Sequence, residues 1–206
     1  MTAPLGFVVG LAAEARIARR LGLVAIGGGM PAGAEAAAEW LVAQGVRGLV
    51  SFGLAGGLDP ALRPGDIMVP AMVRVDRTDF ATTDLAGPTS GRLLAGTAIA
   101  ATAAAKQTLY TTTGAAAIDL ESGAVALVAQ RHNLPFAVLR AICDPAERDV
   151  PPAALAALDA TGAIGVWRIL LSLARRPAQL PGLVTLARDA AIARRALLRA
   201  ADQIRP

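Results

Sequence analysis

The sequence predicts an α/β fold, in which helices are layered on a central sheet and a basic helical tail follows. Two observations support this class. Short apolar runs alternate with segments of helical periodicity throughout residues 1–150. From Pro151 onward the strand-like runs stop, and arginine-rich helical patterns follow. We therefore expect a core over residues 1–150 and a basic amphipathic helical extension over residues 151–206.

The composition indicates a large buried core rather than a disordered or membrane-spanning chain. Hydrophobic residues make up 54% of the 206 residues, and charged residues make up 17%. The longest uncharged run, residues 21–34, contains three glycines in a row and a proline and is shorter than the roughly 20 apolar residues of a membrane span. No basic segment precedes the first apolar run, so we expect no signal peptide and a cytoplasmic protein. A single cysteine excludes a disulfide framework.

In the first part of the core, each strand is predicted by a short apolar run beside glycine. Each helix is predicted by charged residues that are confined to one side. Arg16, Arg19 and Arg20 mark the exposed side of the first helix, and Glu35 and Glu39 mark that of the second. In chain order we expect a strand over 6–10, a helix over 12–21, a strand over 24–26, a helix over 34–44, a strand over 48–52 and a glycine-rich turn over 53–60.

The second part of the core contains one ambiguous segment between clearer elements. A strand is expected over 66–70, after Gly65, and the polar residues 76–91 predict turns. Residues 93–106 are ambiguous, and a strand is expected near 97–100. In chain order, a helix over 121–132 and a strand over 136–142, which leads into Cys143-Asp144-Pro145, complete the alternation.

The tail differs from the core in charge and in periodicity. Residues 151–206 contain eight arginines and three aspartates, a net charge of +5, whereas residues 1–150 have a net charge of −1. A helix is expected over 163–176. A second helical pattern places Arg188, Arg195, Arg199 and Asp202 opposite Leu186, Ala190, Ala193, Leu197 and Ile204.

Two interpretations of the tail stay open. Its helices either pack on the core and expose their arginines, or they also contact an anionic membrane surface. Nucleic acid is not expected as a partner, because the tail has one aromatic residue, Trp167, and no lysine, and so nothing that resembles a base-stacking surface.

Three acidic residues lie where the sequence pattern alone does not require an acid. Glu14 lies four residues after Gly10, Glu121 opens a helix, and Asp144 ends a strand. Ligands bind at the carboxyl ends of strands in open α/β sheets, so these acids are candidates for one site. Glycosidic chemistry needs one acid to protonate the leaving group and another to steer the nucleophile or the sugar. The alternatives also stay open: Glu14 and Glu121 as helix N-terminal residues, and Asp144 as a turn residue.

A glycine-rich loop is a weaker candidate for a ligand site. Gly27–Ala32, GGGMPA, matches a loose glycine loop whose amides, at Gly28 and Gly29, can hold an anion, although a tight turn explains it equally well. The next strand ends without an acid, so neither a nicotinamide nor a flavin cofactor is expected.

The remaining reactive side chains are each assigned a structural role. His132, the one histidine, is expected at a helix C-terminus. Lys106, the one lysine, is expected to be solvated, and Cys143 to be a small packing residue. One histidine and one cysteine exclude a zinc site built from those ligands, and no metal is expected.

Three motifs, taken in order, resemble those of the nucleoside phosphorylase/nucleosidase superfamily. SFGLAGGLDP over 51–60 and RPGDIMV over 63–69 are similar to its glycine-rich turn and the strand after it. DLES over 119–122 is similar to its D-M-E-S/A motif, and RAICD over 140–144 to its R-x-I-S-D motif. Within the superfamily the chain resembles methylthioadenosine/adenosylhomocysteine nucleosidases, and it resembles hopanoid-associated phosphorylases more closely. The resemblance implies the three-layer α/β/α, phosphorylase/hydrolase-like form of this fold, with a mixed central sheet between two layers of helices.

The resemblance also implies a role for each matching residue. Asp144 would donate a proton to the purine as its bond to the sugar breaks, and Glu14 would position or deprotonate a water molecule. Glu121 would accept hydrogen bonds from the ribose hydroxyls. The other implied substrate contacts are Leu120 near the sugar, Ala55 and Gly56 in the glycine-rich segment, and Ile99 in the base-pocket segment.

The implied reaction is cleavage of the adenine–ribose bond in a nucleoside with a bulky apolar 5′ group, namely adenosylhopane in hopanoid biosynthesis. Ser51 and Leu54 stand where phosphorylases of the superfamily place phosphate-binding Arg and Ser, which favours attack by water. Phosphate stays open as a co-substrate, with Gly28, Gly29 and Ser51 as its candidate contacts, and no other cofactor is expected. The alternatives are a purine nucleoside phosphorylase, a methylthioadenosine-type nucleosidase and a catalytically silent nucleoside-binding protein. The resemblance implies a homodimer, and the tail suggests peripheral contact with the inner face of a membrane.

Overall fold

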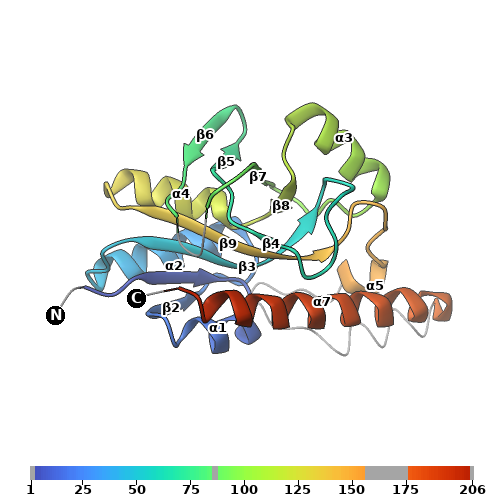
Figure 1. Cartoon of the computed structure of the whole chain (residues 1–206), viewed down its shortest axis with the longest axis horizontal. Coiled ribbons are helices and arrows are strands. Elements are labelled where there is room, and N and C mark those ends of the chain that lie inside the picture. Colours follow the sequence, from blue (N-terminus) through green and yellow to red (C-terminus); the bar gives the residue numbers. More distant parts are fainter. Residues whose placement is uncertain (1–2, 85–87, 156–175, 205–206) are drawn as a thin grey trace.

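A nine-stranded mixed sheet forms the centre of the computed structural model, which describes residues 3–84, 88–155 and 176–204 (Figure 1). The strands are β1 Gly6–Val9, β2 Leu23–Ile26, β3 Leu49–Gly57, β4 Ile67–Met68, β5 Met72–Val75, β6 Thr78–Ala81, β7 Arg92–Ala95, β8 Ala117–Asp119 and β9 Phe136–Asp144. The main path through the sheet is β2-β1-β3-β8-β7-β5-β6, and β9 pairs with β3 and β4. The sheet is mixed, because β1 and β3 are parallel whereas β3 and β8 are antiparallel.

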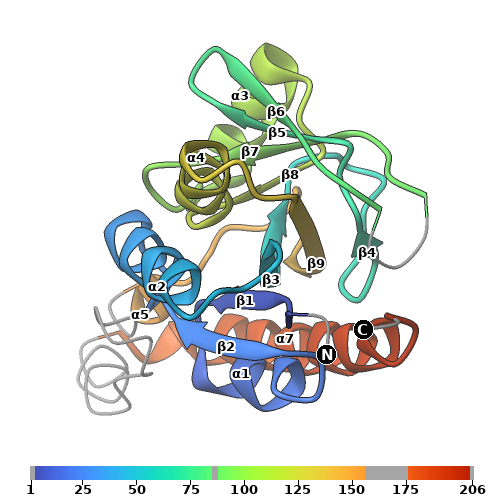
Figure 2. The same ribbon diagram turned by 90° about the vertical axis from the view of Figure 1, so that its left-hand side faces the viewer.

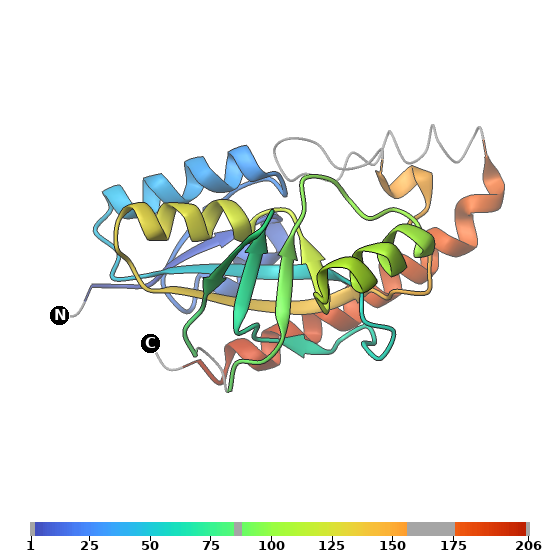
Figure 3. The ribbon, with the colours of Figure 1, turned by 90° about the horizontal axis from the view of Figure 1, so that it is seen from above.

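Helices cover both faces of this sheet, which confirms the three-layer α/β/α class (Figure 2). They are α1 Ala12–Ala18, α2 Pro31–Ala43, α3 Ala103–Thr113, α4 Ser122–Arg131, α5 Pro152–Leu155, the 3-10 helix η1 Pro177–Gln179 and α7 Leu180–Ala201. Figure 3 shows α2 and α4 side by side on one face. The opposite face is covered by α1 and α7, which contact each other. The helix expected over 163–176 lies almost wholly outside the described residues.

Each layer of helices encloses its own apolar core. Successive side chains of a strand point to opposite faces, so Phe7 of β1 faces one core and Val8 faces the other. Both residues are fully buried, as expected for a strand covered on both sides. The α2/α4 core includes Ala38, Leu41, Val125 and Val138, and the α1/α7 core includes Phe52, Leu139, Ala193 and Leu197.

The long parallel pair of β3 and β9 positions the candidate site. Its register runs from Leu49 opposite Phe136 to Gly56 opposite Asp144, with an irregularity at Ala55 and Gly56. The prediction of a turn over 53–60 was wrong in its first half, because β3 continues to Gly57 and ends against β8. The glycines there allow close approach of side chains rather than a reversal of the chain. A Cβ at Gly53 would lie 2.7 Å from both Glu14 Oε1 and Arg140 Nη1.

The segment between residues 72 and 113 also differs from its prediction. A hairpin of β5 and β6 extends into the segment expected to contain turns alone, and it turns at Asp76, whose φ is 51°. No strand forms at 97–100, because β7 has already ended at Ala95. The chain then enters α3, whose first turn is capped by the Thr102 hydroxyl accepting a hydrogen bond from the N–H of Ala105.

Helix α7 packs along β9 and contributes to the α1/α7 core. Its buried positions include Ala193 and Leu197, and Ile204 beyond its end is also buried. Arg188, Arg195 and Arg199 are exposed on the other side. Among the described residues, none of the helices combines the length and apolarity needed to cross a membrane.

Candidate active site

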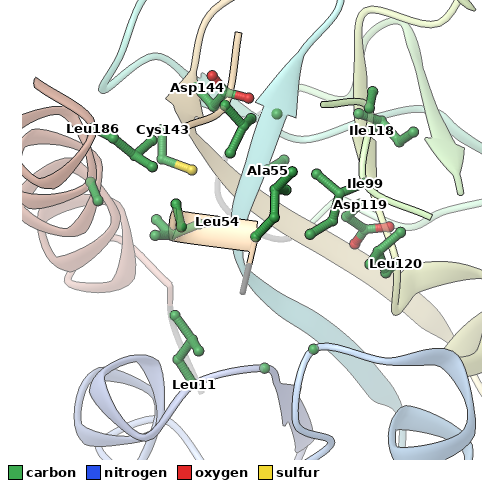
Figure 4. A pocket seen from close by; sticks show the side chains of 18 of the residues that line it. Leu11, Leu54, Ala55, Ile99, Ile118, Asp119, Leu120, Cys143, Asp144 and Leu186 are labelled. Atoms are coloured by element: carbon green, nitrogen blue, oxygen red, sulfur yellow. The ribbon is translucent and has the colours of Figure 1, made fainter. Parts of the chain in front are cut away.

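A cavity of about 640 Å³ lies where several strands end and α7 passes over them (Figure 4). In Figure 4, Leu186 of α7 lies beside Cys143, and Ile99 and Leu120 lie on the opposite side. Most of the lining is apolar. Its charged side chains are those of Glu14, Lys106, Asp119, Glu121, Asp144 and Arg194. The three candidate acids of the sequence therefore lie in one cavity, although they come from three separate connections of the chain.

Glu14 is buried at the start of α1, and both of its carboxylate oxygens are held. Oε2 accepts hydrogen bonds from the N–H groups of Gly10 (3.0 Å) and Leu11 (2.8 Å). Oε1 accepts one from the N–H of Leu54 at 2.9 Å. Burial raises the pKa of Glu14, while Arg140 and the three N–H donors oppose the rise. Glu14 thus stabilises the helix N-terminus and lines the cavity at the same time.

Glu121 is also buried, at the N-cap of α4, and faces the glycine loop. Its Oε1 accepts a hydrogen bond of 3.2 Å from the N–H of Gly29. A Cβ at Gly10 would lie 3.0 Å from Oε2, and one at Gly27 3.1 Å from Oε1, so these glycines make room for the carboxylate. Burial raises the pKa of Glu121 to about 7, and the nearby guanidinium of Arg140 limits the rise.

Arg140 of β9 is the charged centre beneath these acids, and it is 1% exposed. Its Nη2 forms an ion pair with Asp119 and lies 3.6 Å from Glu121 Oε2. Burial lowers the pKa of Arg140, but Asp119, Glu121 and Glu14 raise it more, so the guanidinium stays charged. The sequence indicated Arg140 as part of a motif, but it did not indicate that one cation neutralises acids from two connections. Glu14 lies after β1, and Asp119 and Glu121 lie together at the end of β8.

Asp144, at the end of β9, forms an ion pair of 2.6 Å with Lys106 through Oδ2. The prediction that Lys106 is solvated was wrong, because its side chain is fully buried and lines the cavity. The apolar sequence around Lys106 gave no sign of this partner, since α3 was not recognised as a helix packed against the segment after β9. Burial raises the pKa of Asp144, and the ammonium group of Lys106 counteracts part of that rise.

The structure brings most of the other candidate residues to the cavity, with two exceptions. Ala55, Gly56, Ile99, Leu120 and Gly29 line it, whereas Gly28 and Ser51 do not. Ser51 is fully buried below the site, where its hydroxyl accepts hydrogen bonds from Arg140 Nη2 (2.6 Å) and Ser122 Oγ (2.9 Å). The N–H of Gly29 is already donated to Glu121.

His132 and Cys143 were each assigned a structural role from the sequence. His132 is the C-cap of α4, as predicted, and its Nε2 lies 2.8 Å from Glu39 Oε2. Cys143 lines the cavity, and burial raises the pKa of its thiol to about 12, so it carries no thiolate at neutral pH. Within residues 3–84, 88–155 and 176–204, no three His, Cys, Asp or Glu side chains are grouped so that they could hold a metal ion.

The wall formed by α7 was not predicted as part of the site. Leu183, Leu186 and Ala190 recur at helical spacing, and they face the cavity together with Leu180, Val184 and Ala187. The apolar stripe of the tail was visible in the sequence, but periodicity alone does not distinguish a stripe that fills a core from one that lines a cavity. At its N-terminal end this wall is open to solvent, since Leu180 and Val184 are 52% and 60% exposed.

The chain matches a known protein family. The model of the phosphorylase superfamily matches residues 17–92 and 88–164, which together span more than half of the chain. No curated protein sequence matches this chain.

Several solved structures share the fold. The futalosine hydrolase of Helicobacter pylori strain 26695 has a TM-score of 0.68 at 17% identity, over 99% of this chain and 99% of that one. A 5′-methylthioadenosine/S-adenosylhomocysteine nucleosidase of the same species has a TM-score of 0.67 at 16% identity, over 98% and 99%. The corresponding nucleosidase of Colwellia psychrerythraea 34H, solved in complex with adenine, has a TM-score of 0.65 at 17% identity, over 84% and 95%.

Proposed function

Because the chain belongs to the phosphorylase superfamily, we propose that it is an enzyme that cleaves the N-glycosidic bond of a purine nucleoside and releases the free base. One observation carries this proposal. Glu14, Glu121 and Asp144 come from separate connections of the fold and line the same cavity. A purine leaves poorly as an anion and the sugar becomes positively charged, so the reaction needs both an acid and carboxylates near one point.

Each acid has a surrounding that suits one part of the reaction. The raised pKa of Asp144 favours the carboxylic acid, which protonates an imidazole nitrogen of the purine as the bond to C1′ breaks. Glu121 accepts hydrogen bonds from the ribose hydroxyls, and its negative charge stabilises the oxocarbenium-like sugar. Glu14, fixed by three backbone N–H groups, positions the attacking water and takes its proton.

The charge around Glu14 and Glu121 favours water over phosphate as the nucleophile. Glu14 and Glu121 would repel a phosphate, and the cation near them, Arg140, is already paired with acids. The N–H of Gly29, a candidate phosphate contact, is donated to Glu121. Phosphorolysis is the alternative, and it predicts a requirement for phosphate that hydrolysis does not.

We propose that the substrate is an adenine nucleoside with a large apolar 5′ group, and adenosylhopane is the candidate implied by the sequence motifs. Apolar side chains of α7 form one wall of the cavity, among them Leu183, Leu186 and Ala190. Such a wall binds a hydrocarbon group by removing it from water. The structural relative that was solved in complex with adenine supports the choice of base.

A lipid-like substrate suggests that the protein works at a membrane surface. Leu180 and Val184 are exposed beside the cavity, and the arginines at 188, 195 and 199 are exposed on the same helix. Anionic head groups attract arginine, and exposed leucine and valine enter the acyl boundary. The charge-reversal variant R188E/R195E leaves the buried face of α7 intact and should reduce sedimentation with anionic vesicles. Unchanged sedimentation would contradict the membrane role without affecting the proposed chemistry.

The experiment that tests the proposed function compares two substrates in two buffers. The protein is incubated with adenosylhopane in liposomes and with 5′-methylthioadenosine in solution, each with and without phosphate, and the products are measured by mass spectrometry. We expect adenine from adenosylhopane without phosphate. Adenine released from 5′-methylthioadenosine alone would identify a nucleosidase for small thioethers, and release that requires phosphate would identify a phosphorylase. Binding of adenine without any product would indicate a catalytically silent protein.

A further inference from the structure

We propose that Lys106 is a positioning residue for Asp144. Its ammonium group keeps Oδ2 of the Asp144 carboxyl group as a hydrogen-bond acceptor, so that Oδ1 carries the acid proton. This inference rests on the proposed function, since it assigns how the acid of that reaction is prepared. The observation that supports it is that Lys106 is buried and that each N–H of its ammonium group has an acceptor within the site.

The ammonium group of Lys106 has three acceptors for its three hydrogens. Nζ lies 2.6 Å from Asp144 Oδ2, 2.9 Å from the carbonyl oxygen of Pro145 and 2.7 Å from that of Arg148. An ammonium group donates three hydrogen bonds and accepts none. Because every N–H has a partner, Oδ2 of Asp144 must act as an acceptor, and a proton on the carboxyl group must lie on Oδ1.

The surroundings keep this arrangement rigid. Lys106 is fully buried, and the segment after Asp144 is joined to the start of α3 by further hydrogen bonds. The N–H of Ala103 donates to Asp149 Oδ1 at 2.8 Å, and the N–H of Val150 donates to the carbonyl oxygen of Ala101 at 2.8 Å. These bonds would hold the segment without Lys106. Burial of a lysine costs free energy, so its presence beside the acid calls for a reason beyond anchoring the loop.

The position of Lys106 also allows it to stabilise the carboxylate that Asp144 becomes after the proton transfer. When the bond between C1′ and the purine nitrogen breaks, its electron pair goes to the base, and the Oδ1–H bond breaks as an imidazole N–H bond forms. Asp144 is left as a carboxylate. Its new charge lies 2.6 Å from an ammonium group that already donates to Oδ2, so no side chain has to move to stabilise it. Lys106 keeps all of its protons throughout.

The test uses two substrates that differ in their need for an acid. One is the adenine nucleoside that the wild type cleaves, adenosylhopane or 5′-methylthioadenosine, whose base leaves well only when protonated. The other is the p-nitrophenyl riboside with the same 5′ group, whose phenolate leaves without a proton. In the variant Lys106→Met, we expect kcat for the nucleoside to fall by about 100-fold or more, with little change in KM. For the p-nitrophenyl riboside we expect kcat to stay within about threefold of wild type, because its cleavage does not use the acid.

Three controls separate positioning from a structural role. Asp144→Asn should reproduce the same selective loss, since it removes the acid itself. Thr102→Ala removes the cap of α3 without touching the pair and should not discriminate between the substrates. Lys106→Arg keeps the charge and the donors, and it should restore part of the activity on the nucleoside. Lys106→Gln, which keeps two N–H donors but loses the charge, is measured in the same way if Lys106→Met does not fold.

The outcomes are distinct. An equal loss on both substrates, no loss on either, or failure of both uncharged variants to fold would give Lys106 a purely structural role and overturn this inference. Wild-type protein that releases adenine from neither adenosylhopane nor 5′-methylthioadenosine overturns the proposed function, and the inference falls with it.

Discussion

The side chain of Glu14 accepts a hydrogen bond of 2.9 Å from the backbone N–H of Leu54, a residue 40 positions later in the chain. Its other oxygen is held by the N–H groups of Gly10 and Leu11. One carboxylate therefore joins the start of α1 to the end of β3 at the edge of the cavity. A side chain held in this way is preorganised, so its replacement should affect the reaction more than the fold.

We expect Glu14→Gln to lower kcat by about 10²–10⁴-fold, because the amide cannot take a proton from water. The variant should remain folded, because the glutamine oxygen can keep the bonds from Gly10 and Leu11. Its amide nitrogen cannot accept the N–H of Leu54, which should lower the free energy of unfolding by about 1–3 kcal/mol. Steady-state kinetics and circular dichroism measure the two effects. Glu39→Gln, at a half-exposed position on α2, is the matched control and should retain wild-type kcat. Full activity in Glu14→Gln would remove Glu14 from the proposed mechanism.

We expect Asp144→Asn to abolish release of the purine without unfolding the protein. Asparagine cannot protonate the departing base, but its oxygen can still accept the hydrogen bond from Lys106. Adenine is quantified by mass spectrometry, and thermal unfolding reports on the fold. Asp149→Asn, five residues later, keeps the acceptor for the N–H of Ala103 and serves as the control. Retained turnover in Asp144→Asn would exclude Asp144 as the acid.

The raised pKa of Glu121 predicts that folding stability falls as pH rises. In the folded protein this pKa is about 7, against 4.5 for an unperturbed glutamate. The folded state therefore binds the proton more tightly, and the contribution is fully present below about pH 4.5 and is lost as pH rises through about 7. The shift corresponds to about 3 kcal/mol in the free energy of unfolding.

Urea denaturation between pH 5 and pH 8 measures this contribution. We expect Glu121→Gln to lose less stability over that range than the wild type, because glutamine does not ionise. At pH 5 both side chains are neutral in the folded protein, which provides an internal reference. Parallel pH profiles for the two proteins would show that burial of Glu121 does not oppose its ionisation.

Loss of Arg140 should destabilise the fold strongly. Its guanidinium compensates Asp119 and Glu121, which are both buried, and Arg140→Met would leave these charges unpaired. Removing one partner of a buried ion pair costs about 3–5 kcal/mol. The control is Arg131→Met, because Arg131 pairs with Glu35 and Glu39 on the surface, where screening makes the loss far smaller. Equal denaturation midpoints for the two variants would contradict this account of Arg140.

A larger side chain at position 190 should change the choice of substrate. Ala190 lines the α7 wall, so Ala190→Leu reduces the space for a long 5′ group. We expect kcat/KM to fall by about 10–200-fold for the nucleoside with the large apolar group and far less for 5′-methylthioadenosine. Ala191→Leu adds the same volume on the same helix at a position that does not line the cavity. If Ala190→Leu and Ala191→Leu each change kcat/KM equally for the two substrates, the wall does not bind the 5′ group.

Several features of the site could be predicted from short segments of sequence. Glu14 follows β1 and Asp144 ends β9. Both strands run parallel to β3, and parallel strands bring their carboxyl ends to one edge of a sheet. Glu121 opens α4 after β8, which is antiparallel to β3, so the pairing of β8 with the end of β3 brings it to the site. The family motif over residues 140–144 coincides with the second half of β9. Boundaries were predicted less well, because the glycines at 53–57 can form either a turn or a strand approached closely by side chains, and the pairing with β9 selects the strand.

By itself, the sequence determined the α/β class, the superfamily resemblance and the three acids, because local periodicity and short motifs specify which residues end a strand or face a core. Tertiary structure alone decided that Lys106 is buried against Asp144, that Arg140 neutralises acids from separate connections, and that α7 forms a wall of the cavity. The reason is physical. A charged side chain is stable in the interior only beside a partner, and that partner is supplied by whichever distant element packs against it.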